Sequence, residues 1–218
     1  MQLARKGSAL VFEPDDNAAS ADIARDDADL VDEAKHNPNA FAALYERYRQ
    51  AIYVYCFRRL GTPESADDAT STIFMKAFAA LPRFRSDRAR SGFTFRSWLF
   101  SIAHNVVIDA WRRDRHHVSL DGAREELLAP HLVDSSGSPE EVALGAEEAR
   151  RVIALLAQLP ERQRAGVELR LAGLSTSEVA HTLGMSIPAT KSMQFRAYRT
   201  LRDLLHSHPQ AITREIPR

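Results

Sequence analysis

The stretch TFRSWLFSIAHNVVIDAWRRDRHH, residues 94–117, has the pattern of one long amphipathic helix. Its apolar residues recur at steps of three or four, the spacing that stacks side chains on one helix face. These residues are Phe95, Leu99, Ile102, Val106 and Ala110. Arginines crowd the carboxyl end, where cations complement the helix dipole, so a core helix with a capped end is one interpretation. The other is a helix that packs by one face and contacts nucleic acid along its edge, which also accounts for the arginines that precede it.

The charges of the 218-residue chain cancel overall, with 29 basic and 29 acidic residues, but they separate along its length. Residues 1–40 carry a balance of −5 and residues 118–150 a balance of −6. In contrast, residues 81–117 carry +5 and residues 187–205 carry +3. Two basic helical segments separated by an acidic connector favour a protein that contacts nucleic acid at two sites.

Cysteine content and motif content exclude several classes of protein. A single cysteine, Cys56, cannot form an internal disulfide or a cysteine-rich zinc site. No apolar run is long enough for a membrane span, and no signal-peptide pattern begins the chain, so we expect a cytoplasmic protein without membrane insertion. We find no nucleophile elbow, zinc-spaced cluster or phosphate-binding glycine loop, and His116 and His117 are typical of a solvated helix end. We therefore expect no enzyme activity, no metal and no cofactor.

Interruptions in the helical spacing of apolar residues mark where the expected helices end and where the chain divides into two domains. Helices are expected at residues 21–37, 40–60, 63–81, 94–117, 138–160, 161–171 and 187–206. No strand-like alternation persists, so the predicted fold is all-α, with two small helical domains joined by a flexible acidic linker. The predicted organisation is an acidic, partly disordered extension at 1–38, a helical domain at 39–117, a linker at 118–138, a second helical domain at 139–206 and a tail at 207–218.

The second domain contains the pattern of a helix-turn-helix. Ser175 and Glu178 form a capping box at the start of a short helix, and Gly184 turns the chain. Ser186 then caps a longer basic helix. A short helix, a turn with glycine and a second, basic helix are typical of a DNA-binding helix-turn-helix, although two ordinary packed helices would show the same pattern.

Taken together, these segments resemble the extracytoplasmic-function group of bacterial sigma factors. FAALYERY at 41–48, ADDATSTIFMKAF at 66–78 and FRSWLFSIAHNVVIDAWRR at 95–113 are similar to successive parts of the second sigma region. The stretch LPERQRAGVELRLAGLSTSEVAHTLGMSIPATKSMQFRAYRTLR, residues 159–202, is similar to the fourth. The resemblance implies a sigma factor that binds core RNA polymerase and directs promoter-specific transcription initiation. The second region would read and melt the minus-ten element, the fourth would read the minus-thirty-five element, and an anti-sigma protein would be a further partner.

Residues of the second region are suited to an opened DNA strand. A flipped base needs hydrogen-bonding groups at its edge and a surface to stack on, and its phosphates need cations. The expected minus-ten residues are Arg83, Arg85, Arg88, Arg90, Phe93, Ser101, Asn105, Asp109, Arg112, Arg113 and Arg115.

Residues at the start of the last helix are suited to duplex DNA. A recognition helix presents its N-terminal residues to base edges in the major groove, and methyl groups favour contact with thymine. The expected minus-thirty-five residues are Ser186, Pro188, Ala189, Thr190, Lys191, Gln194, Arg196 and Arg199. Met193 and Gln194 stand where the family usually has Arg and Leu.

Polymerase binding is expected on the helix 63–81. The family resemblance implies contact through Asp67, Asp68, Ser71, Thr72, Phe74 and Met75. The two aspartates keep the acidic character of the family pattern, whereas Ser71 and Thr72 replace its usual Gln and Glu. Two alternatives remain: a stand-alone helix-turn-helix regulator, which leaves the arginine-rich loop without a role, and a sigma-like scaffold for protein contacts, which the altered Ser71 and Thr72 favour.

Overall fold

The computed structural model describes residues 27–85, 92–117 and 149–207, except for the side chains of residues 114–117. Every regular element in these ranges is a helix, which confirms the all-α prediction. The elements are η1 (Pro38–Ala40), α2 (Phe41–Leu60), α3 (Pro63–Ala80), η2 (Leu81–Arg83), α4 (Phe95–His117), α6 (Glu161–Leu171), α7 (Thr176–Thr182) and α8 (Ile187–Ser207), with further helical residues at 27–34 and 149–157. None of these helices is long and apolar enough to cross a membrane.

Local signals set the boundaries of α2 and α3. Gly61 ends α2 in the left-handed conformation, with φ of 86°, which glycine adopts without a steric penalty. Thr62 caps α3, because its side chain accepts a hydrogen bond from the backbone N–H of Ser65, and Pro63 occupies the first helical position. These two helices and α4 form the N-terminal half, residues 27–117, around fully buried residues such as Ile52 and Leu99.

The helix-turn-helix forms the C-terminal half, residues 149–207, together with α6. The capping box is present in both directions: Ser175 accepts from the backbone of Glu178, and the Glu178 carboxylate accepts from the backbone of Ser175. Gly184, with φ of 61°, follows α7, and Ser186 accepts from the backbone N–H of Ala189 at the start of α8. The predicted helix 138–160 is described only from residue 149, and the predicted linker, 118–138, lies outside the described residues.

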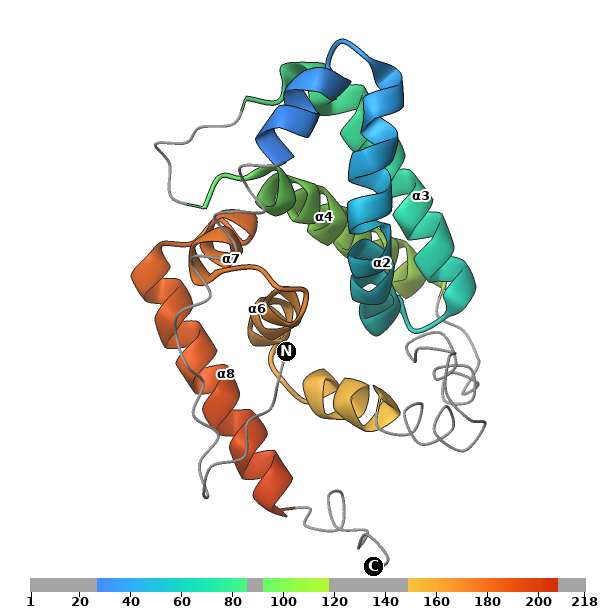
Figure 1. Ribbon diagram of the computed structural model, residues 1–218. Coiled ribbons are helices and arrows are strands. Elements are labelled where there is room, and N and C mark those ends of the chain that lie inside the picture. Colours follow the sequence, from blue (N-terminus) through green and yellow to red (C-terminus); the bar gives the residue numbers. More distant parts are fainter. Residues whose placement is uncertain (1–26, 86–91, 118–148, 208–218) are drawn as a thin grey trace, which may run out of the picture.

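The two halves pack directly on each other, which the sequence did not predict. Figure 1 shows α4 between the pair α2 and α3 on one side and α7 on the other. Buried residues of the C-terminal half, Leu169, Leu174 and Val179, belong to the same hydrophobic cluster as the core of the N-terminal half. A second, smaller cluster lies among α6, α8 and the helical residues 149–157. Burial of apolar surface is the main favourable contribution to such packing.

Candidate nucleic-acid and polymerase interfaces

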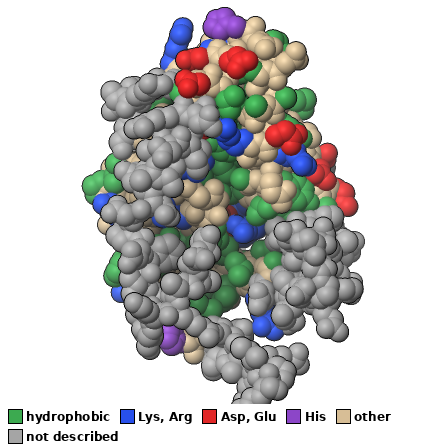
Figure 2. Space-filling model, in the orientation of Figure 1, with side chains coloured by type: hydrophobic (Ala, Val, Ile, Leu, Met, Phe, Trp, Pro, Cys, Tyr) green, Lys and Arg blue, Asp and Glu red, His purple; other side chains and the backbone are tan. Residues whose placement is uncertain are grey.

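One face of α3 is exposed and acidic. Asp67, Asp68 and Ser71 are exposed on α3, and Met75 is a large apolar side chain with 66% of its surface accessible. Figure 2 shows acidic side chains on the side of the molecule that α3 forms. Phe74 does not join this face: it is buried, with its ring 4.7 Å from that of Tyr45. Phe74 therefore contributes to the core and is left out of the surface proposed below.

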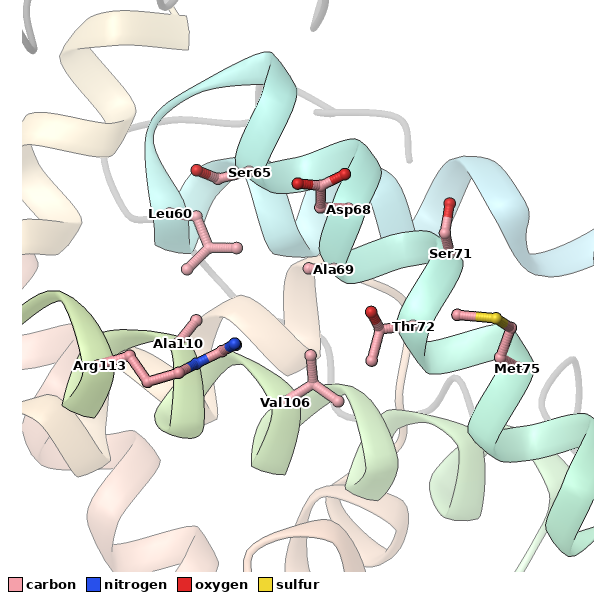
Figure 3. A pocket seen from close by; sticks show the side chains of 10 residues that line it. All are labelled: Leu60, Ser65, Asp68, Ala69, Ser71, Thr72, Met75, Val106, Ala110 and Arg113. Atoms are coloured by element: carbon pink, nitrogen blue, oxygen red, sulfur yellow. The ribbon is translucent and has the colours of Figure 1, made fainter.

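A groove of about 710 Å³ lies between α3 and α4. Its lining residues are Leu60, Ser65, Asp68, Ala69, Ser71, Thr72, Met75, Val106, Ala110 and Arg113. In Figure 3, Thr72 points from α3 toward α4, and the side chain of Arg113 reaches along the groove from the opposite wall. The groove therefore joins the acidic face of α3 to the basic end of α4.

The outer edge of α4 carries polar residues in successive turns. Asn105, Asp109, Arg112 and Arg113 are exposed, and Arg112 lies 3.8 Å from the Asp109 carboxylate. Ser101 is half-buried, and its hydroxyl donates to the backbone oxygen one turn earlier, at 2.7 Å. The hydroxyl oxygen keeps its capacity to accept. The helix thus brings together the α4 residues expected at the minus-ten element; Arg115 lies on the last turn of α4, but its side chain is outside the described residues.

Aromatic rings gather at the start of α4. Arg83 and Arg85 are exposed on either side of Phe84, which is buried. The Phe84 ring lies 4.8 Å from Trp98 and 5.6 Å from Phe93. Phe93 is half-buried in this cluster, so its ring is held in place by packing. The expected residues Arg88 and Arg90 lie outside the described residues.

The start of α8 divides into an outer and an inner face. The outer face carries most of the residues expected at the minus-thirty-five element: Ser186, Pro188, Ala189, Lys191, Arg196 and Arg199 are exposed. Thr190 and Gln194 differ from the expectation, because both are buried. The Thr190 hydroxyl donates to the backbone oxygen of Ser186, and the Gln194 side-chain oxygen accepts from Thr176 of α7. Gln194 therefore links α8 to α7, Thr190 bonds within the start of α8, and neither side chain lies on the outer face.

Two residues of the outer face were missed from the sequence. Phe195 is 70% exposed, and Ser192 is also exposed. Helical spacing could have found Phe195, because it lies four residues after Lys191 and shares its face. Met193 accounts for which residues of α8 face outward. Its side chain is buried against α6, where Gly166 leaves room for it.

Buried ion pairs connect the two halves beside α4. Arg96, at the start of α4, pairs with Glu178 of α7 at 2.8 Å, and Arg59 of α2 pairs with Glu168 of α6 at 3.1 Å. Burial disfavours the charged form of Glu178, but hydrogen bonds and charge from Arg96 outweigh it, so its pKa lies below the ordinary value. Burial is the larger effect at Glu168 and raises its pKa despite the neighbouring arginines. Among the described residues, no group of His, Cys, Asp and Glu could hold a metal ion.

Comparisons with known proteins identify both halves. The family model described as Sigma-70 region 2 matches residues 44–117, and that described as Sigma-70, region 4 matches residues 149–201. The ECF RNA polymerase sigma factor BldN of Streptomyces coelicolor is 34% identical over 190 residues, covering 86% of this chain and 69% of that protein. The ECF RNA polymerase sigma factor SigD of Mycobacterium tuberculosis is 33% identical over 182 residues, covering 81% and 82%. Among solved structures, CnrH in complex with the cytosolic domain of CnrY matches with a TM-score of 0.58 and 29% identity, covering 82% of this chain and 96% of that chain.

Proposed function

The chain belongs to the extracytoplasmic-function group of RNA polymerase sigma factors and directs transcription initiation, and we propose which of its surfaces contact the two promoter elements and which contacts core RNA polymerase. The observation that carries the proposal is the pairing of two exposed polar faces, one on α4 and one on α8, within the two matched sigma regions. As a partner of core RNA polymerase, the protein acts in the cytoplasm as an initiation factor and not as an enzyme.

The outer edge of α4 reads and holds the opened minus-ten strand. Asn105 and Asp109 offer hydrogen-bonding groups to a base edge, and Ser101 offers its free acceptor. Arg112 and Arg113 neutralise phosphates in the adjoining turn, and Arg83, Arg85, Arg88, Arg90 and Arg115 are assigned the same role. Phe93 supplies an aromatic face, and stacking of a base on such a ring contributes about 1–3 kcal/mol.

The outer face of α8 reads duplex DNA at the minus-thirty-five element. Ser186 caps α8, and Pro188, Ala189 and Lys191 lie in its first turn and a half, where a recognition helix contacts base edges. Arg196 and Arg199 contact phosphates. We add Phe195 and Ser192, because an exposed ring beside lysine on this face offers apolar contact to a thymine methyl group. Thr190 and Gln194 position the helix from its inner side.

The acidic face of α3 and the adjoining groove bind core RNA polymerase. Asp67, Asp68 and Ser71 are exposed there, and Thr72 and Met75 line the groove. An apolar side chain as exposed as Met75, on the same helix as the exposed Asp67 and Asp68, suits a protein partner with basic and apolar groups. CnrH was solved with the cytosolic domain of CnrY, and by analogy we propose that an anti-sigma protein also binds this chain.

Reconstituted transcription tests the proposal. Purified protein and core RNA polymerase are incubated with a random promoter library, and the selected templates are used in run-off transcription. We expect a defined pair of promoter elements that core enzyme alone does not use. Binding to duplex DNA without any association with core enzyme would instead support a stand-alone helix-turn-helix regulator.

Two substitutions separate the assigned contacts. Asn105→Ala is expected to weaken promoter opening, measured by permanganate reactivity of the melted strand, without weakening binding to core enzyme. Lys191→Ala is expected to weaken protection of the upstream element in a footprint while opening on a pre-melted template is retained. An equal loss of opening and of core binding by Asn105→Ala would overturn the minus-ten assignment, and unchanged upstream protection would overturn that of α8.

A further inference from the structure

The hydroxyl of Ser101 is oriented so that it accepts hydrogen bonds from the outer edge of α4. Its hydrogen is donated to the backbone oxygen of Ser97 at 2.7 Å. Ser97 is completely buried, so no water can replace the serine hydrogen at that oxygen. A hydroxyl has one hydrogen and two lone pairs, so the Ser101 oxygen can still accept but has nothing left to donate. A group that approaches Ser101 from outside therefore binds best when it donates.

Two further polar side chains follow Ser101 on the same edge, one turn apart. Asn105 and Asp109 are both exposed, and residues four apart on a helix have Cβ atoms about 5–6 Å from each other. The Asn105 amide has no hydrogen-bond partner in the part of the chain that the structure describes, so it can turn either its oxygen or its nitrogen toward a ligand. A carboxylate, as on Asp109, accepts. The edge thus presents an acceptor on each side of one adaptable group.

The four DNA bases differ in how many hydrogens they can offer to such an edge. An opened strand exposes the Watson–Crick edges of its bases. Adenine, cytosine and guanine each carry an exocyclic amino group, whereas thymine has carbonyl groups instead. Thymine would place a carbonyl oxygen against the Ser101 oxygen, and an acceptor without a partner costs more than a missing hydrogen bond. Since Ser101 is half-buried, water there competes less for these contacts.

We propose that Ser101 is a specificity-determining residue, whose oxygen accepts a hydrogen bond from the exocyclic amino group of one base in the opened minus-ten strand. Thymine is disfavoured at that position. The inference rests on the proposed function, because it takes the outer edge of α4 as the surface that holds this strand. Asn105 bonds to the neighbouring ring atom with its oxygen or its nitrogen, as the base requires. Asn105 therefore contributes affinity for any of the amino-bearing bases, and Ser101 contributes the selection against thymine.

Removal of single amino groups from the DNA tests the proposal on the full chain. The protein is assembled with core RNA polymerase, and its Kd for a fluorescent single-stranded oligonucleotide of the selected minus-ten sequence is measured by anisotropy. Each amino-bearing base is replaced in turn by an analogue without the amino group. These analogues are purine for adenine, 2-pyrimidinone for cytosine and hypoxanthine for guanine. At one position we expect the Kd to rise about fivefold, as for the loss of one neutral hydrogen bond.

Variants of Ser101 show whether that amino group is bound by this residue. Ser101→Ala removes the acceptor and keeps a strong helix former, so the same analogue should change the Kd by less than about twofold. Ser101→Thr should retain the fivefold dependence, because threonine can make the same bond to the preceding turn. Thr190 does so in α8, where it donates to the backbone oxygen of Ser186 at 3.0 Å.

Ser177→Ala is the matched control. It removes a half-buried hydroxyl from α7, outside both proposed promoter contacts, and should keep the dependence of the parent protein on the amino group. Far-UV circular dichroism checks that each variant keeps its helix content.

The role of Ser101 would be overturned if amino-group removal had the same effect on the parent and on folded Ser101→Ala, or if it had no effect at any position. Thymine selected at the position where Ser101→Ala alters binding would overturn it as well. In these cases, binding of the selected strand by the parent holoenzyme leaves the proposed function intact. If the parent holoenzyme does not bind that strand at all, the proposed minus-ten contact fails, and the role of Ser101 fails with it.

Discussion

Replacing Met193 by alanine tests how the recognition helix is held against α6. Met193 is 3% exposed, and its Cε lies 2.3 Å from the position that a Cβ on Gly166 would take. Truncating a buried methionine costs about 2–5 kcal/mol, through lost burial and the cavity that remains. We expect about 3 kcal/mol, in the middle of that range. Since about 1 kcal/mol shifts the midpoint by about 2–4 °C in a chain of this size, Tm should fall by about 6–12 °C.

Gly166→Ala provides the second arm of a double-mutant cycle. Alanine is favoured over glycine inside a helix by about 1 kcal/mol, whereas overpacking against Met193 costs about 1–3 kcal/mol, so a net loss of up to about 2 kcal/mol is expected. In the Met193→Ala protein the overpacking disappears, and the same change should stabilise by about 1 kcal/mol. Guanidinium chloride unfolding of the four proteins measures the coupling. An identical effect of Gly166→Ala in both backgrounds would refute the packing of Met193 on Gly166 as the feature that sets the register of α8.

Three further predictions concern other parts of the chain. Tyr48→Phe should lower the free energy of unfolding by about 1.5–3 kcal/mol, measured by chemical denaturation, because the buried Asp27 carboxylate loses its hydroxyl donor. The pKa of Glu178 lies below its ordinary value of 4.5 in the folded protein. The carboxylate therefore stabilises the fold fully above pH 4.5, and this contribution is lost as the pH falls through the lowered pKa. Glu178→Gln should make the free energy of unfolding less dependent on pH in that acidic range, measured by chemical denaturation. Phe195→Ala should change the free energy of unfolding by less than about 0.5 kcal/mol, because the ring is exposed, and yet weaken binding to the upstream element in a mobility-shift assay.

Helix boundaries were predictable because the signals that set them are local. The capping box at Ser175 and Glu178 and the sequence Gly61-Thr62-Pro63 place each helix end within a few residues, and the structure confirms them. The apolar stripe of residues 94–117 likewise predicted α4, whose core face includes Leu99 and Val106. A pattern of this kind reports one element and its own buried face.

Contacts between distant segments were not predictable in the same way. Arg96 belongs to an arginine-rich stretch that favours contact with nucleic acid, but its side chain is buried against Glu178, 82 residues later. Gln194 and Thr190 lie among residues suited to base contact, but the packing of α8 on α7 turns them inward. Single-sequence periodicity does not identify which polar residues of a helix face a neighbouring helix. The assignment of individual site residues therefore depends on tertiary packing.

Buried charges, and not apolar packing alone, join the two halves. A buried ion pair has a small net effect on stability, because the attraction between the charges is offset by the loss of their hydration. Removing Arg96 alone would leave the Glu178 charge buried without this partner, which costs more than the pair itself contributes. The Glu178 carboxylate also accepts a hydrogen bond from the backbone N–H of Ser175, so the same group caps α7 and pairs with α4. Glu178 therefore fixes both the start of α7 and its orientation on α4, although the net contribution of the ion pair to stability is small.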